Sequence, residues 1–165
     1  MPRAYVSIGS NVDKERHIRA ALDELRARFG ALTVSPVYES EAVGFEGENF
    51  YNLVVSFETT ETPRAIAAAL LAIENAHGRV REPDRKFGPR TLDLDLILYG
   101  EAIIDEPGLR LPRAEIAEHA FVLRPLADIA PQEKHPCTGI TFTRMWAQFR
   151  APEQKLHPVP FDVGA

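Results

Sequence analysis

The chain has almost no cysteine and no long apolar run. Cys137 is the single cysteine among 165 residues, which excludes an internal disulfide and a cysteine metal cluster. No hydrophobic stretch reaches the roughly 20 residues that a membrane-spanning helix needs. The first residues also lack the basic and apolar regions of a secretory signal. We therefore expect a cytoplasmic protein that does not bind membranes.

An excess of positive charge is missing as well. The 19 Lys and Arg residues are outnumbered by 24 Asp and Glu residues, for a formal net charge of −5. Nonspecific nucleic-acid binding depends on neutralising phosphates, so no nucleic-acid partner is expected. A hydrophobic content of 45% suits a folded globular protein. The length predicts a single domain over residues 1–165, and we expect a monomer.

Two common phosphate-binding motifs are absent from the sequence. There is no G-x-x-x-x-G-K-[ST] loop and no G-x-G-x-x-G fingerprint. If the protein binds a nucleotide, side chains and a metal ion must therefore hold the phosphates in place of a glycine-rich backbone.

The first half of the chain alternates between strand and helix patterns. Residues 5–8 read as a strand, and Asn11 or Asp13 is expected to cap the helix that follows, whose apolar residues recur every three or four positions up to Phe29. A second strand is expected over residues 34–40, interrupted by a proline, and a third over residues 50–58.

The second half predicts one more helix and one more strand of the same unit. Thr62-Pro63 opens a helix that ends near residue 78, and residues 92–99 form the fourth strand. The resulting βαββαβ order predicts an α+β, ferredoxin-like fold, with an antiparallel sheet and both helices on one face. Short strands near 102–104 and 109–111 and a short helix near Glu115 should precede a loop-rich C-terminal extension with a short helix around 145–149.

Residues 88–100 carry the most informative motif, which reads Gly-Pro-Arg-Thr-Leu-Asp-Leu-Asp-Leu-Ile-Leu-Tyr-Gly. Because side chains alternate along a strand, Asp93 and Asp95 should share one face while their leucine neighbours face the core. Adjacent carboxylates repel each other unless protons or a cation neutralise them. Mg²⁺ is commonly held by one or two carboxylates and substrate phosphates, so the pair is a candidate magnesium site.

The acidic pair also has a simpler interpretation, because a D-x-D pattern is equally compatible with a solvated strand face. Five cations lead into this strand: Arg79, Arg81, Arg85, Lys86 and Arg90. Arginine can bind phosphate oxygens through two N–H groups at once, and arginines with metal ions stabilise phosphoryl transfer. The combination favours a site for metal and phosphate.

The same motif resembles the signature of the 6-hydroxymethyl-7,8-dihydropterin pyrophosphokinase family. Residues 5–11 are similar to that family's first strand and turn, residues 50–52 to its pterin-pocket strand, and residues 121–126 with 129–131 to its C-terminal part. The resemblance implies that pyrophosphate passes from Mg-ATP to the hydroxymethyl group of the pterin, with release of AMP, in folate biosynthesis.

The resemblance also implies roles for particular residues. Asp93 and Asp95 would bind two Mg²⁺ ions that bridge the ATP triphosphate, and Arg79 and Arg90 would be catalytic. Further contacts to the nucleotide would come from Leu71, Glu74, Arg81, Lys86, Phe87, Leu96, Arg110, Arg113 and His119. Taken alone, Glu74 fits a solvated helix position better.

The pterin site is implied in the same way. Its residues would be Ser40, Val43, Gly44, Phe50, Asn52 and Phe121. Asn52 would hydrogen-bond the ring edge, and the two phenylalanines would sandwich the flat ring. Aromatic residues at such positions more often belong to the core, although Phe50 and Asn52 share a strand face.

The chain departs from the family pattern around this site. Arg113 stands where the family usually has histidine after Leu-Pro, and His119 where it usually has arginine before the pocket phenylalanine. Histidine is often neutral at pH 7, whereas arginine is always charged. Phe87 replaces a loop tryptophan, and Leu71 replaces a polar residue.

Two other functions stay open from the residues alone. A divergent paralogue that binds a pterin or nucleotide with little turnover would release no AMP, and a metal-dependent phosphohydrolase would release phosphate from ATP without a pterin. No residue stands out as a general base. Catalysis is therefore expected to rest on positioning and charge neutralisation.

Overall fold

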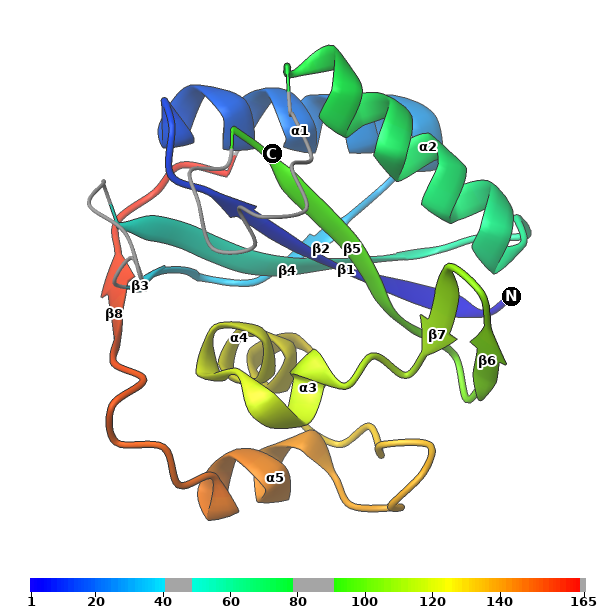
Figure 1. Ribbon diagram of the computed structural model, residues 1–165, viewed down its shortest axis with the longest axis vertical. Coiled ribbons are helices and arrows are strands. Elements are labelled where there is room, and N and C mark those ends of the chain that lie inside the picture. Colours follow the sequence, from blue (N-terminus) through cyan, green and yellow to red (C-terminus); the bar gives the residue numbers. More distant parts are fainter. Residues whose placement is uncertain (41–48, 79–90, 164–165) are drawn as a thin grey trace.

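The protein, described by a computed structural model for residues 1–40, 49–78 and 91–163, is built around one antiparallel sheet. Two long helices cover one face of the sheet, and the C-terminal helices cover the other (Figure 1). Among the described residues, no helix has both the length and the hydrophobicity required to cross a membrane.

The strand order of the sheet is β5-β1-β4-β3-β8, and β2 pairs separately with β4. The strands are β1 (Arg3–Ser10), β2 (Thr33–Val34), β3 (Val37–Ser40), β4 (Phe50–Glu58), β5 (Asp93–Tyr99) and β8 (Leu156–Val159). Neighbouring strands are antiparallel in every pair. This arrangement confirms the predicted ferredoxin-like α+β fold, with β8 added at the edge.

Helices α1 (Lys14–Phe29) and α2 (Pro63–Ala76) begin and end close to the predicted residues. Thr62 caps α2, because its side chain accepts a hydrogen bond from the backbone N–H of Ala65. Gly30 ends α1 with a φ of 87°, a conformation that glycine adopts at little cost. Asp13 takes the N-cap position of α1 without a side-chain capping bond, so the predicted capping role is wrong for this residue.

The opposite face of the sheet is covered by α3 (Glu115–Glu118), α4 (Ala120–Ile129) and α5 (Phe142–Gln148). They enclose a second apolar cluster with residues of the sheet such as Val54 and Ile97. Before them comes a separate hairpin of β6 (Ile104–Glu106) and β7 (Leu109–Leu111). The first hairpin strand lies two positions later than predicted, and α5 begins three positions before the predicted residues and ends one position before them.

The C-terminal extension differs most from the sequence prediction. A loop-rich tail was expected, but residues 156–159 form β8 and pair with β3 in a register that places Ser40 opposite Leu156. Val159 and Phe161 also pack against the main core. The hydrogen-bonding partner of β8 is more than a hundred positions earlier in the chain, so local sequence patterns do not reveal it.

The side chains of β5 alternate between the two faces of the sheet only along the first part of the strand. From Asp93 to Leu96 its side chains alternate as predicted, with the leucines in the core beneath α1 and α2. A bulge follows, because Val6 of β1 pairs with Leu96 whereas the preceding Tyr5 pairs with Leu98. Ile97 and Leu98 then both join the second cluster.

Candidate active site

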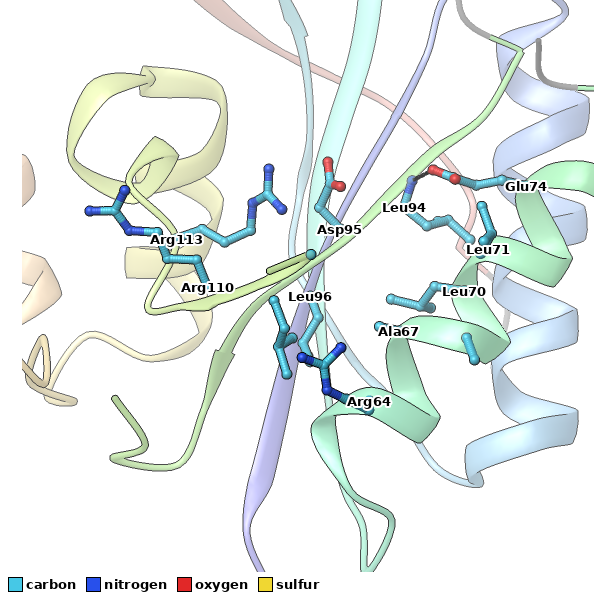
Figure 2. Close-up of a pocket in the computed structure, with 13 residues that line it drawn as sticks. Arg64, Ala67, Leu70, Leu71, Glu74, Leu94, Asp95, Leu96, Arg110 and Arg113 are labelled. Atoms are coloured by element: carbon cyan, nitrogen blue, oxygen red, sulfur yellow. Dashed lines mark hydrogen bonds between the residues drawn. The ribbon is translucent and has the colours of Figure 1, made fainter. Parts of the chain in front are cut away.

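A pocket of about 480 Å³ lies beside β5, at the edge of the sheet in the described part of the chain. It is bounded by α2, β5, the β6–β7 hairpin and the segment after β7 (Figure 2). Its lining consists of Arg64, Ala67, Ala68, Leu70, Leu71, Glu74, Leu94, Asp95, Leu96, Gly108, Leu109, Arg110 and Arg113. Small and apolar side chains of α2 thus face arginines across the edge of β5.

Glu74 is fully buried at this pocket, so the interpretation as a solvated helix residue is wrong. Its Oε2 accepts a hydrogen bond from the backbone N–H of Leu94 at 2.7 Å. Strands at a sheet edge present N–H groups that lack a neighbouring strand, and a buried carboxylate is costly unless hydrogen-bonded. The Glu74 carboxylate and the N–H group of β5 therefore meet each other's need for a hydrogen bond, and the contact fixes α2 against the strand.

Asp93 and Asp95 lie on the same side of β5. Both are half-buried, whereas Leu94 and Leu96 are buried in the core on the opposite side. Figure 2 shows Asp95 between Arg110 of β7 and Arg113, on one side, and the Glu74 side of α2 on the other. The two acids therefore face a shared space, as the alternation in the sequence predicts.

Arg113 is held by several contacts next to these acids. Its Nε donates to Glu115 Oε2 at 2.9 Å, and its Nη2 donates to the same oxygen. Its backbone N–H donates to the carbonyl of Ile97 on β5 at 3.0 Å. Burial acts to lower the pKa of Arg113, but Asp95, Glu115 and Asp93 outweigh burial and raise it. The guanidinium therefore stays charged and experiences the field of both β5 acids.

A second group of polar residues lies on the same face of the sheet as Asp93. Asn52 is buried, and its Nδ2 donates to Ser40 Oγ at 2.8 Å. Gly9 of β1 pairs with Asn52 on one side and with Asp93 on the other. Since opposite residues in antiparallel strands share a face, the three positions form one row. The glycine leaves the middle of that row without a side chain.

Phe121 and His119 lie where α4 begins. Their rings stack with centroids 4.8 Å apart and an interplanar angle of 13°. Neither residue lines the pocket beside β5. His119 therefore contacts the aromatic ring that was predicted for the pterin, although the nucleotide was the ligand expected for His119.

The acidic pair suits Mg²⁺ better than a metal bound by protein ligands alone. In the described residues no group of three or more His, Cys, Asp or Glu side chains is assembled for a metal. Mg²⁺ typically binds one or two carboxylates and takes its other ligands from phosphates and water. Two half-buried aspartates beside a cation-lined pocket match that donor set.

A family model described as 7,8-dihydro-6-hydroxymethylpterin-pyrophosphokinase (HPPK) matches residues 5–131. This chain belongs to the HPPK family. The matched region begins within β1 and runs through β7 and α4, so it contains every candidate site residue, and it ends before α5 and β8.

Curated relatives agree with the family. A 2-amino-4-hydroxy-6-hydroxymethyldihydropteridine pyrophosphokinase of Pseudomonas aeruginosa is 44% identical over 138 residues, which cover 81% of this chain and 84% of the relative. The protein of the same name from Bacillus subtilis is 34% identical over 162 residues, covering 93% of this chain and 96% of the relative.

Solved structures of Plasmodium falciparum HPPK-DHPS share the fold. One, a triple mutant with pteroate, has a TM-score of 0.71 at 13% identity and covers 89% of this chain. The wild type with SDX-DHP has a TM-score of 0.66 at 12% identity. This chain spans 43% of each of those two longer chains.

The HPPK site predicted from sequence is partly assembled by the structure. The pocket gathers Leu71, Glu74, Asp95, Leu96, Arg110 and Arg113. Phe50, at the start of β4, is half-buried two positions from Asn52. The remaining candidates, which lie outside the described residues, are Val43, Gly44, Arg79, Arg81, Lys86, Phe87 and Arg90.

Arg64 lines the HPPK pocket but was missed by sequence reasoning. Its Nη2 forms an ion pair with Glu106 at 2.8 Å and donates to the carbonyl of Pro107 at 3.3 Å, which ties α2 to the hairpin. A signal was present, since Arg64, Ala67, Ala68 and Leu71 recur at helical spacing on one face of α2.

Proposed function

We propose that this protein transfers pyrophosphate from Mg-ATP to the hydroxymethyl group of 6-hydroxymethyl-7,8-dihydropterin and releases AMP, a step of folate biosynthesis. The observation that carries the proposal is the placement of Asp93 and Asp95. They stand between a cation-lined pocket on one side and the row that leads through Gly9 to Asn52 on the other. A nucleotide on one side and a pterin on the other would meet at these acids.

The pocket provides the features that a nucleotide needs. Ala67, Leu70 and Leu71 offer an apolar wall for a base, and Arg110 and Arg113 supply positive charge for phosphates. Leu96 lies two positions beyond Leu94, so its backbone groups point outward from the same strand edge. Polar atoms of an adenine ring can hydrogen-bond such an edge.

We propose that Asp93 and Asp95 hold two Mg²⁺ ions. When bound, Mg²⁺ supplies positive charge that offsets the negative charge of the triphosphate. The carboxylates orient their oxygens from a rigid strand, and Arg113 adds a fixed cation next to them. Arg79 and Arg90 keep the catalytic role that the family resemblance implies, and Arg81, Lys86 and Phe87 keep their nucleotide contacts.

The pterin would lie against the row on the other side of the acids. Asn52, oriented by Ser40, would bond the amide-like ring edge, and Phe50 and Phe121 would stack on the ring faces. Val43 and Gly44 keep the pterin contacts that the family resemblance implies. His119, stacked on Phe121, would extend this aromatic surface.

In the reaction, the hydroxymethyl oxygen of the pterin attacks the β-phosphorus of ATP. A new bond forms between that oxygen and the β-phosphorus, and the bond from the β-phosphorus to the oxygen that bridges it to the α-phosphorus breaks. AMP leaves with that oxygen, and the hydroxyl proton is lost to solvent. The residues of the site contribute alignment and charge neutralisation, and none is assigned as a general base.

We further propose that residues 1–165 act as a single cytoplasmic domain and as a monomer.

A coupled assay of AMP release tests the proposal. We expect AMP to form only when ATP, Mg²⁺ and the reduced pterin are all present. Phosphate release from ATP without pterin would favour a phosphohydrolase. Tight pterin or nucleotide binding with no AMP would favour a binding paralogue, and either result would refute the proposed function.

A further inference from the structure

We propose that Glu115 is a positioning residue: its carboxylate holds the Arg113 guanidinium in the orientation that faces the β5 acids and the ATP triphosphate. This inference rests on the proposed function, because it concerns the same nucleotide site. It goes further in assigning the orientation of Arg113, which lines the pocket, to an acidic residue that is not itself one of the lining residues.

The contact between the two side chains is specific in its geometry. Both the Nε and the Nη2 of Arg113 donate to Glu115 Oε2, and the Nε distance is 2.9 Å. The two hydrogen bonds use the edge of the guanidinium formed by Nε and Nη2. They leave Nη1 unused by Glu115. A planar fork held along one edge presents its remaining donors in a fixed direction.

The surroundings make this contact stronger than an ordinary surface ion pair. The side chains of Arg113 and Glu115 are only 36% and 32% exposed. Burial alone would raise the pKa of Glu115, yet the hydrogen bond and charge of Arg113, together with the charge of His119, lower it. Glu115 is therefore ionised at neutral pH and binds Arg113 as a carboxylate.

Position in the chain supports a role in orientation. The backbone N–H of Arg113 is bonded to the carbonyl of Ile97, two residues beyond Asp95 on β5. Glu115 is the first residue of α3, which is anchored by the buried Ile116. Backbone and side chain of Arg113 are thus fixed by two different elements, and little rotamer freedom is left to lose when a phosphate binds.

Charge alone does not explain an acid at this place. A carboxylate beside a bound triphosphate repels it, so Glu115 by itself would weaken nucleotide binding. If Glu115 acted only through its charge, removing it would tighten ATP binding and leave turnover unchanged. Orientation of Arg113 predicts the opposite sign, with a loss of turnover.

The experiment compares Glu115→Ala and Glu115→Gln with Glu118→Ala, a matched control on the exposed side of the same helix. Each variant is made in the wild-type protein and in an Arg113→Met background. The AMP-release assay gives kcat and KM for Mg-ATP, and calorimetry gives the affinity for a non-hydrolysable ATP analogue. NMR follows solvent exchange of the Arg113 Nε–H in the ligand-free protein.

We expect Glu115→Ala to lower kcat about tenfold, the scale of one charge-assisted hydrogen bond. Glu115→Gln keeps an acceptor oxygen without the charge, so its kcat should lie between those of Glu115→Ala and the wild type. The kcat of Glu118→Ala should stay within about twofold of the wild-type value. In the Arg113→Met background Glu115→Ala should have no further effect, because the two residues act as one unit.

Other results overturn the inference. An equal loss with and without Arg113 would show that Glu115 acts through something else, and tighter ATP binding at unchanged kcat would show simple repulsion. If the wild type forms no AMP with pterin, the proposed function fails. The Nε–H signal still decides the inference in that case, because unchanged exchange in Glu115→Ala would show that Glu115 does not hold Arg113.

Discussion

At the scale of single residues, the absence of a side chain at Gly9 is as important as the acids beside it. A Cβ built on Gly9 would lie 3.0 Å from Asn52 Oδ1, a contact tighter than folded proteins normally allow. Asn52 is buried and bonded to Ser40, so it has little room to move away. Glycine therefore keeps the amide of Asn52 in place and leaves space between Asn52 and Asp93.

We predict that Gly9→Ala weakens pterin binding more than nucleotide binding. The added methyl group must displace the Asn52 amide, and such overpacking typically costs about 1–3 kcal/mol. KM for the pterin should rise about tenfold while KM for Mg-ATP changes little, as measured by the AMP-release assay. Equal changes in both constants would show that the glycine serves the fold instead of the pterin side.

Asp95 provides the most direct test of the proposed metal site. Asp95→Asn keeps the size of the side chain but removes the charge, and we expect kcat to fall about 10²- to 10³-fold, as when one strong transition-state contact is removed. The melting temperature should change little, because Asp95 is only half-buried. Near-normal turnover at saturating Mg²⁺ would remove the acid pair from the mechanism.

At the scale of elements, a chain of polar contacts ties α1 to the end of α2. His17 Nδ1 lies 2.7 Å from Nδ1 of His77, and His77 Nε2 lies 2.8 Å from Glu24 Oε2. When both rings are neutral, His77 donates from Nε2 to the carboxylate and accepts from His17 at Nδ1. The tie therefore depends on at least one ring nitrogen carrying no proton.

Protonation of His17 should lower the stability of the folded protein. Burial, His77 and Arg16 lower the pKa of His17, and Asp13 opposes them only in part. The pKa of His17 is thus lower in the folded than in the unfolded protein, so the unfolded state takes up the proton first as the pH falls. The stability from neutral His17 is present above its unfolded pKa near 6.5 and is lost as the pH falls below it.

We predict that the wild type loses more thermal stability between about pH 7.5 and about pH 5.5 than His17→Gln does. Melting followed by circular dichroism at the two pH values measures the difference. The exposed His157 supplies the control, since His157→Gln should keep the pH response of the wild type. An identical response in His17→Gln would show that His17 does not set the acid sensitivity of the fold.

At the scale of the whole molecule, the C-terminal extension supplies β8, the strand at the sheet edge opposite β5. After β8, Phe161 meets Tyr51 edge to face with ring centroids 6.2 Å apart, and Arg19 lies over the Phe161 ring. Arg26 of α1 then donates to the carbonyl of Val163 at 2.8 Å. The tail therefore joins the sheet edge to α1, although it lies beyond the region matched by the family model.

We predict that Phe161→Ala destabilises the protein by about 1–3 kcal/mol, less than a fully buried phenylalanine because the ring is half-buried. Urea unfolding measures the change. Ile103→Ala is the matched control, because Ile103 is 63% exposed and its truncation should have little effect. If the two variants have the same stability, the tail contributes nothing to the core.

Much of the fold could be read from the chain because it depends on local patterns. The cap at Thr62, the helical spacing in α1 and the alternation from Asp93 to Leu96 each involve residues a few positions apart, and the structure confirms all three. The D-x-D motif with its leading cations likewise suggested metal and phosphate chemistry without any tertiary information.

Other features depended on contacts between residues that are distant in the chain. Glu74 looked like a solvated helix residue until the fold placed it against Leu94, 20 positions away. Arg64 joined the pocket only because the hairpin brought Glu106 to α2, and the tail became a strand only because β3 offered an edge. Periodicity and capping report the neighbours of a residue along the chain, whereas burial and pairing of this kind follow from how the elements pack.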